Sequence, residues 1–377
     1  MSSLKYIAIL GRQPELGLIE LESLLGPTSV EPFGGEAALI NDAVHIDRLG
    51  GALKIAEVLY RGEAKLLREL PLELAKLSMR ESKTPFALSA YGSKETPQML
   101  ISAGLELKKK LRERGSVRFI APAKGLAVTA AELRHNKVVE DGFELLVIYA
   151  GEEMVIACTL GVQDIDWYSR RDYERPMRSA KVGMLPPKLA QVLVNTTHSE
   201  IVYDPFCGTG VVLQEALLMG REACGSDLSE TMVTSSRKNL PWLGEQVGYA
   251  LPNWNIELAD ARNIVLPVGC AVVTEGYLGP NLSHVPSITE LKTMKVELLA
   301  LYRECLVNWA RQLPSGTEVS LTAPAWRSGR EWHYLGLVDE IARLGYTLRS
   351  FEHVRTPVLY AREDQLVGRQ LLLLRKN

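Results

Sequence analysis

The spacing of apolar residues in the first half of the chain predicts small α/β units. Strict alternation of apolar and polar residues indicates strands, and a helical repeat of apolar residues indicates helices. On this basis we expect strands at 4–10, 37–40, 86–91, 117–120, 144–150 and 154–160, and helices at 14–25 and 97–114. These elements divide into an α/β domain at 1–62 and a second one at 63–165.

The second half alternates strands with helices more regularly. We expect helices at 188–196, 211–219, 229–240, 289–312 and 332–344, and strands at 201–203, 222–226, 255–258, 270–274, 317–323, 347–351 and 370–374. Such alternation is typical of a parallel, doubly wound sheet. The sequence therefore predicts an α/β fold with a larger domain at 188–377. A segment rich in Arg, Tyr and Pro at 166–187 is predicted to be the linker before it.

Length and composition narrow the class of protein. A chain of 377 residues exceeds what one hydrophobic core usually fills, which indicates more than one domain. Hydrophobic residues make up 46% and charged residues 23% of the chain, which excludes disordered and fibrous classes. The longest apolar runs fall far short of the roughly 20 residues that span a bilayer. The first ten residues lack the apolar core and cleavage site of a secretory signal. We expect a cytoplasmic protein without a membrane partner.

Cysteine usage and net charge bear on metals and partners. The five cysteines are scattered, with no CxxC pair and no spacing suited to a zinc cluster, so no metal is expected. The formal net charge is −2. A nucleic acid would therefore have to bind a local basic face.

A glycine-containing loop at 204–210 is the first candidate for a ligand site. Its sequence, Asp-Pro-Phe-Cys-Gly-Thr-Gly, lies where a predicted strand ends and a helix begins, which is where open α/β sheets bind ligands. Gly208 and Gly210 allow a ligand to approach the backbone closely. Asp204 can neutralise an α-ammonium group and disfavours a phosphate. The alternative is an ordinary glycine turn.

Two further acids follow the next two predicted strands. Asp227 ends the strand at 222–226 and can accept both hydroxyls of a ribose, as the acid about 20 residues downstream does in dinucleotide sites. Asp260 follows the strand at 255–258 and can accept from an adenine amino group. Either residue alone could instead cap a helix. Three acids at successive strand ends favour a cofactor site.

Three segments resemble one enzyme family. The loop at 204–210 resembles motif I of methyltransferases that act on guanine N2 in RNA. The segments 175–188 (Arg-Pro-Met-Arg-Ser-Ala-Lys-Val-Gly-Met-Leu-Pro-Pro-Lys) and 365–369 (Gln-Leu-Val-Gly-Arg) resemble the THUMP-domain-containing tRNA (guanosine-10 N2) methyltransferases. The resemblance covers most of the chain, strongly at 170–260 and more weakly in the N-terminal half.

The resemblance implies a fold and a cofactor. The C-terminal domain would be Rossmann-like, with a mostly parallel seven-stranded sheet and an antiparallel strand near the C-terminus. The first half would combine a ferredoxin-like domain at 1–62 with a THUMP-like RNA-binding domain at 63–165. S-adenosylmethionine would contact Asp204, Pro205, Phe206, Cys207, Gly208, Gly210, Asp227, Leu228, Asp260 and Ala261.

The end of the fourth strand departs from the family pattern. Amino methyltransferases carry Asp/Asn-Pro-Pro-Tyr there, whereas this chain has Thr274-Glu275-Gly276-Tyr277. Tyr277 keeps a ring for stacking the base, and Thr274 or Glu275 keeps an acceptor for the amine hydrogens. Accepting these hydrogens turns the nitrogen lone pair toward the methyl group and removes the proton that becomes acidic. We therefore predict Thr274, Glu275 and Tyr277 as catalytic, the alternative for Glu275 being a place in a surface loop.

Methylation at a pyrimidine C5 position is not expected. That reaction needs a cysteine nucleophile. Cys207 lies within the cofactor loop and Cys270 begins a strand, so neither is placed for it.

A local excess of basic residues is the candidate RNA-binding face. Between residues 108 and 137 there are nine Lys or Arg against two acids, which suits phosphate binding. The predicted RNA-binding residues are Lys108, Lys109, Lys110, Arg112, Arg171, Arg175, Arg178 and Lys181. The alternative for the helix at 97–114 is that its cations only complement the helix dipole.

These observations predict a tRNA methyltransferase that acts on the N2 amine of a guanosine, guanosine 10 by resemblance. The alternatives are an rRNA or DNA amino methyltransferase, and a noncatalytic RNA-binding protein with a degenerate fourth motif. The sequence leaves open whether one or two methyl groups are transferred. It also leaves open whether the protein is a monomer or needs a small activating subunit.

Overall fold

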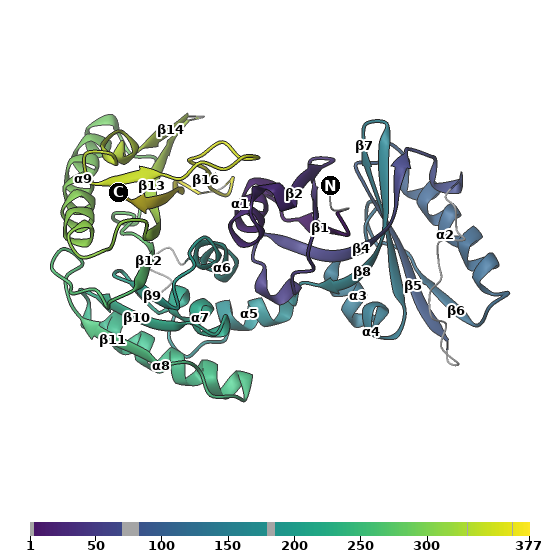
Figure 1. Ribbon diagram of the computed structural model, residues 1–377, viewed down its shortest axis with the longest axis horizontal. Coiled ribbons are helices and arrows are strands. Elements are labelled where there is room, and N and C mark those ends of the chain that lie inside the picture. Colours follow the sequence, from purple (N-terminus) through teal and green to yellow (C-terminus); the bar gives the residue numbers. More distant parts are fainter. Residues whose placement is uncertain (1–3, 70–82, 179–184, 330, 364) are drawn as a thin grey trace. The chain divides into compact units, whose positions relative to one another are not determined.

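The fold is taken from a computed structural model (Figure 1), which describes residues 4–69, 83–178, 185–329, 331–363 and 365–377. The chain forms two compact units, Met1–Asp166 and Trp167–Asn377. Within the described ranges, every helix is too short or too polar to traverse a bilayer.

The first unit is built on one sheet with the strand order β2-β3-β1-β4-β8-β7-β5-β6. Its elements are β1 (Tyr6–Leu10), α1 (Pro14–Leu25), β2 (Val30–Phe33), β3 (Ala37–Ile40), β4 (Ala52–Glu63), β5 (Thr84–Tyr91), α2 (Pro97–Leu111), β6 (Val117–Ile120), α3 (Ala130–His135), α4 (Val138–Asp141), β7 (Phe143–Ala150) and β8 (Glu153–Val162). Strand β4 pairs with β1 on one side and with β8 on the other, so the sheet is continuous. The predicted division between 1–62 and 63–165 falls at the end of β4 and stays a prediction.

Helix α2 packs on the β5 and β6 side of this sheet (Figure 1). Thr96 caps its N-terminus by accepting a hydrogen bond from the Met99 backbone N–H. Leu100, Leu107 and Leu111 recur at helical spacing and are buried, whereas the opposite face of α2 is exposed. The helix therefore presents its basic C-terminal end outward.

The second unit has the strand order β11-β10-β9-β12-β13-β17-β15, with β14 beside β13 and β16 beside β17. Its elements are α5 (Ile165–Tyr173), α6 (Pro187–Asn195), β9 (Ile201–Asp204), α7 (Val211–Leu218), β10 (Glu222–Asp227), α8 (Glu230–Val247), β11 (Trp254–Leu258), β12 (Cys270–Glu275), α9 (Ile288–Ala310), β13 (Glu318–Ser328), β14 (Glu331–Tyr334), β15 (Tyr346–Leu348), β16 (Leu359–Tyr360) and β17 (Val367–Lys376). Strands β11, β10, β9, β12 and β13 run parallel, and β17 runs antiparallel to β13. The expected antiparallel strand near the C-terminus is confirmed. The carboxyl ends of the parallel strands share one edge of the sheet.

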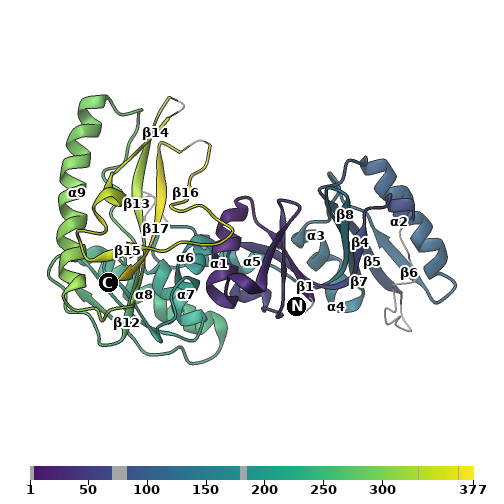
Figure 2. The ribbon, with the colours of Figure 1, turned by 45° about the horizontal axis from the view of Figure 1, so that its top comes forward.

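Helix α9 lies along the β13 side of this sheet in both views (Figures 1 and 2). Tyr302 and Trp309 of α9 are among the largest fully buried side chains and join a cluster with Leu321 of β13 and Leu372 of β17. This packing fixes the helix beside the end of β12.

The prediction of a helix at 332–344 is wrong. Its first residues form β14, which pairs antiparallel with β13, and a short 3₁₀ helix follows at Leu337–Glu340. Gly336 between them has a φ of 90°, a left-handed conformation that an α-helix through this position would not allow. Pairing with a neighbouring strand thus overrides the local helical pattern.

The segment expected to be a linker begins as helix α5. Arg171 of α5 is buried and pairs with Glu215 of α7, with 2.8 Å between Nε and Oε1. Farther along, the Met177 backbone N–H donates to Asn239 Oδ1 of α8 at 2.9 Å. The described part of this segment is therefore packed onto the helices of the second unit.

Candidate cofactor and substrate site

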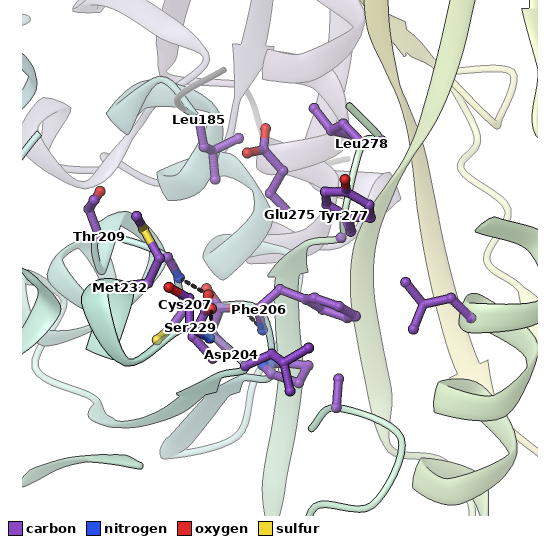
Figure 3. A pocket seen from close by; sticks show the side chains of 18 of the residues that line it. Leu185, Asp204, Phe206, Cys207, Thr209, Ser229, Met232, Glu275, Tyr277 and Leu278 are labelled. Carbon is purple, nitrogen blue, oxygen red and sulfur yellow. Dashed lines mark hydrogen bonds between the residues drawn. The ribbon is translucent and has the colours of Figure 1, made fainter. Parts of the chain in front are cut away.

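A cavity of about 940 Å³ opens at the carboxyl ends of β9, β10 and β12 (Figure 3). Its wall includes the loop after β9 at 204–209, the end of β10 at 227–229, the turn after β11 at 260–262, the segment after β12 at 275–282, and residues 365–367 and 369. The predicted cofactor residues Asp204, Pro205, Phe206, Cys207, Gly208, Asp227, Leu228, Asp260 and Ala261 all line it. Gly210, the remaining one, lies at the N-cap of α7 behind the wall.

Asp204 is a buried carboxylate at the floor of the cavity, with 2% of its surface exposed. Its Oδ1 accepts from the Phe206 backbone N–H at 3.0 Å and from the Thr274 hydroxyl at 2.5 Å. Burial raises the pKa of Asp204 to about 7, and the charges of Asp227 and Glu275 add to the rise. A cation that enters the cavity would favour its ionised form.

Asp227 ties the end of β10 to the glycine loop. Its Oδ2 accepts from the Gly208 backbone N–H at 2.9 Å, and its Oδ1 accepts from the Ser229 backbone N–H at 2.8 Å. Burial raises the pKa of Asp227. A carboxylate has about four lone-pair positions, so both oxygens retain capacity for ligand hydroxyls.

Asp260 lines the cavity, but its carboxylate already has partners. It accepts from the Arg262 backbone N–H at 3.0 Å and forms an ion pair with the Arg262 guanidinium at 2.5 Å. These hydrogen bonds lower the pKa of Asp260. Contact between Asp260 and an adenine amino group stays a prediction, and Arg262 is a neighbour that the motif did not reveal.

Thr274, which was predicted to be catalytic, is not among the residues that line the cavity, and its burial corrects that prediction. Thr274 is fully buried within β12, and its hydroxyl donates to Asp204. Successive residues of a strand point to opposite faces, so Thr274 and Glu275 cannot both face the cavity. Thr274 instead supports the position of Asp204.

Glu275 is the last residue of β12 and lines the cavity (Figure 3). Its Oε1 accepts from Nε of Arg369 on β17, and the side chains of Glu275 and Arg369 are 16% and 4% exposed. Burial raises the pKa of Glu275, and the charge of Arg369 opposes the rise. Arg369 was not predicted as a site residue, although it ends the segment 365–369 that resembled the family.

The structure explains why glycine replaces proline at position 276. A Cβ atom there would lie 2.1 Å from the hydroxyl oxygen of Tyr302 on α9. That hydroxyl lies 3.1 Å from the Tyr277 carbonyl oxygen and 3.2 Å from the Thr322 carbonyl oxygen, and its single proton is shared between these two acceptors. Tyr302 therefore occupies the space of a ring at 276 and fixes the backbone of Tyr277, whose own ring lines the cavity and is 47% exposed.

The predicted RNA-binding residues separate into exposed and buried groups. Lys109, Lys110 and Arg112 are exposed at the C-terminal end of α2, and Lys108 is half-buried there. Arg178 is exposed, and its guanidinium stacks on the Tyr173 ring at 4.9 Å. Lys181 lies outside the described residues.

The prediction that Arg171 and Arg175 bind RNA is corrected by the structure. Both side chains are buried, with 3% of their surface exposed. The Arg171 guanidinium pairs with Glu215 and stacks on Tyr168 at 4.3 Å. Residues enclosed in this way cannot contact a phosphate on the surface, so they contribute to packing.

Comparisons with known proteins give one match to a family model and several to curated relatives. Residues 175–264 match the family model described as RMKL-like, methyltransferase domain. The chain is 32% identical over 165 residues to a tRNA (guanine(10)-N2)-dimethyltransferase of Methanothermobacter thermautotrophicus, covering 42% of each chain. It is 35% identical over 96 residues to the protein of the same name from Pyrococcus abyssi, covering 25% of this chain and 26% of the relative. The matches thus span less than half the length of these relatives.

A solved structure resembles the chain over nearly its whole length. TrmN from Thermus thermophilus aligns with a TM-score of 0.54 at 20% identity and covers 99% of both chains. This likeness concerns the fold. The predicted resemblance to tRNA methyltransferases and the predicted α/β fold with a Rossmann-like methyltransferase domain are confirmed. The THUMP-like assignment of the N-terminal half stays a prediction.

Proposed function

We propose that the protein is an S-adenosylmethionine-dependent tRNA methyltransferase that acts on the exocyclic N2 amine of a guanosine. The proposed position of this guanosine is 10. The observation that carries the proposal is the meeting of Asp204, Asp227, Glu275 and Tyr277 at one cavity. Curated relatives of the chain are named for this reaction. The acids suit a cationic donor, and Glu275 with Tyr277 suits a base that carries an amine.

The cavity contains groups for each part of the proposed cofactor. Asp204 would pair with the α-ammonium, and Asp227 would accept from the ribose hydroxyls. The exposed Leu228 and the buried Ala261 offer apolar surface to the adenine ring. Bound S-adenosylmethionine supplies a methyl group already activated by the sulfonium charge.

With an activated donor, the protein mainly has to orient the amine. Tyr277 offers a ring face on which the base can stack. Glu275 accepts amine hydrogens and thereby aims the nitrogen lone pair at the methyl group. When the nitrogen gains positive charge, the same carboxylate is an acceptor for the departing proton.

The first unit supplies the proposed RNA-binding surface. Lys108, Lys109, Lys110 and Arg112 gather at one end of α2, with Arg178 as a further candidate cation in the second unit. In this proposal, residues 1–62 and 63–165 hold the tRNA while the domain at 188–377 receives one extruded guanosine. Extrusion costs about a few kcal/mol of unstacking and unpairing. A tRNA substrate would place the protein in the cytoplasm.

Nucleoside analysis tests the proposal. Purified protein is incubated with unmodified tRNA and labelled S-adenosylmethionine, and the tRNA is digested and mapped by mass spectrometry. We expect label in N2-methylguanosine or N2-dimethylguanosine at position 10. Label in adenosine or cytidine would overturn the substrate assignment.

A variant at the cofactor site provides the control. Asp227→Ala should abolish binding of S-adenosylmethionine and leave tRNA affinity nearly unchanged, because Asp227 lies in the cavity of the second unit. Glu297→Ala on α9 removes an exposed acid outside the cavity and should bind cofactor normally. Undiminished cofactor binding by Asp227→Ala in a calorimetric titration would refute the site assignment.

A further inference from the structure

The ion pair between Glu275 and Arg369 bears on the charge of the carboxylate that lines the cavity. Arg369 is buried, and its Nε donates to Glu275 Oε1. A guanidinium keeps its proton at any physiological pH. The direct ion pair with Arg369 stabilises the charged form of Glu275 against burial. An ionised carboxylate is a hydrogen-bond acceptor only.

An acceptor-only group distinguishes purines by their Watson–Crick edges. Guanine presents two adjacent donors, N1–H and the N2 amine. Adenine presents its N6 amine beside N1, which is an acceptor. A carboxylate that receives the amine of adenine would place its second oxygen against the N1 lone pair, and a buried pair of acceptors is costly.

We propose that Glu275, kept ionised by Arg369, determines base specificity by accepting both N1–H and the N2 amine of guanine. In this role Glu275 touches the substrate, and Arg369 is a positioning residue that acts through it. The proposal rests on the proposed methyltransferase function and adds the N1–H contact, which the methyl transfer itself does not require.

Two side-chain contacts fix the position of this acceptor, where the family pattern has two prolines. Arg369 fixes one oxygen of Glu275 from β17, and Tyr302 fixes the Tyr277 carbonyl from α9. The carboxylate and the stacking ring are thus anchored on both sides of Gly276. Recognition of one edge of a base needs such fixed geometry.

Two other titratable groups of the described residues interact electrostatically with Glu275, and neither is a cation. They are Asp204 and the hydroxyl of Tyr302. Negative charge on Asp204 favours protonation of Glu275, as burial does. Without Arg369, the pKa of Glu275 would therefore rise further, which favours the neutral carboxyl group, both a donor and an acceptor.

A purine analogue separates base recognition from methyl transfer. 2,6-Diaminopurine keeps the reactive 2-amino group but has an acceptor at N1. The wild-type protein should methylate a tRNA transcript with guanosine at the target position at least about 100-fold faster than one with diaminopurine, since sites built to bind a polar group reject analogues that lack it. Equal rates on the two transcripts would overturn the proposal.

Glu275→Gln should reverse the preference. Its amide presents a donor and an acceptor, which match N1 and the amine of diaminopurine and clash with N1–H of guanine. We expect guanosine methylation to fall and diaminopurine methylation to rise relative to it. A far-UV circular dichroism spectrum like that of the wild type verifies that the variant is folded.

Arg369 variants test the positioning role through pH. In Arg369→Met the preference should move toward diaminopurine at low pH and return to guanosine as pH rises and Glu275 ionises. Arg369→Lys keeps a positive charge and should retain a guanosine preference that does not vary with pH. A pH-independent preference for guanosine in a folded Arg369→Met variant would overturn the role of Arg369.

The outcomes separate this proposal from the proposed function. Guanosine methylation by the wild type, with no change of preference in Glu275→Gln, would refute base selection by Glu275 and leave the function intact. Absence of methylated guanosine with the wild type, despite cofactor binding, would refute the function itself.

Discussion

Asp204 is the residue whose ionisation most directly controls the proposed cofactor site. With a pKa of about 7 it is largely protonated below neutrality in the free protein, because burial disfavours its charge. An α-ammonium pairs with the ionised form, so binding releases a proton. Affinity for S-adenosylhomocysteine, which carries the same ammonium, should fall as pH drops below 7, approaching about tenfold per unit.

Calorimetric titrations between pH 5.5 and 7 measure this dependence. Over the lower part of this range the ligand amine stays protonated, since an α-amino group titrates at about 8. Asp204→Asn should bind more weakly at pH 7 and show a much flatter profile. A steep profile that persists in Asp204→Asn would assign the titration to another group, with Asp227 the next candidate.

Gly276 should tolerate no side chain while Tyr302 is present. Its Cβ would lie 2.1 Å from the Tyr302 hydroxyl, so Gly276→Ala should reduce the free energy of unfolding by about 1–3 kcal/mol. In a Tyr302→Leu background the space is open, and the same substitution should cost much less. Denaturant unfolding of the two single variants and the double variant measures this coupling.

A control for the glycine substitution is available on α8. A Cβ at Gly244 would come no closer than 3.6 Å to Leu251, so Gly244→Ala should not destabilise the protein. If Gly276→Ala behaved like Gly244→Ala, the packing of Tyr302 would not be the reason for the glycine.

At the scale of elements, helix α5 depends on a buried ion pair with α7. Arg171 and Glu215 are 3% and 1% exposed, and burial raises the pKa of Glu215 while Arg171 opposes the rise. Arg171→Met removes the guanidinium that bonds the buried carboxylate, leaving Arg175 as a nearby cation, and should destabilise the second unit by about 3–5 kcal/mol. Replacing both residues, as Arg171→Met with Glu215→Leu, should recover most of this loss.

This prediction also separates packing from RNA contact. If Arg171 only packs, the double variant should keep the tRNA affinity and salt dependence of the wild type. A lower salt slope in a stable double variant would restore Arg171 to the RNA-binding face.

Local patterns predicted most of the second unit, because its strands and helices carry their own periodicity. The loop at 204–210 and Asp227 could be identified because these residues of the proposed cofactor site are close in sequence. Arg369 could not, since it meets Glu275 only through the pairing of β17 beside β13. Arg171 was misjudged for the same reason, as its partner Glu215 lies 44 residues away. Likewise, residues 331–334 form strand β14 because they pair with β13, although their own sequence pattern favours a helix.

At the scale of the whole molecule, the two units have different proposed tasks. The cavity and its acids belong to the second unit, whereas Lys109, Lys110 and Arg112 are exposed at the C-terminal end of α2 in the first. Substitutions on α2 should therefore change tRNA affinity without changing cofactor affinity. The sequence alone indicated that the two tasks belong to different units, since the basic stretch at 108–137 and the loop at 204–210 do not overlap.

Charge reversal on α2 tests the role of the first unit. Lys109→Glu with Arg112→Glu should weaken tRNA binding and reduce the slope of log affinity against log salt by about two, because each lost phosphate contact lowers it by about one. Lys238→Glu with Lys292→Glu makes the same change in net charge at exposed positions of the second unit. Equal losses in both pairs would indicate a general effect of net charge. Unchanged affinity of the α2 variant at every salt concentration would place the RNA on another surface.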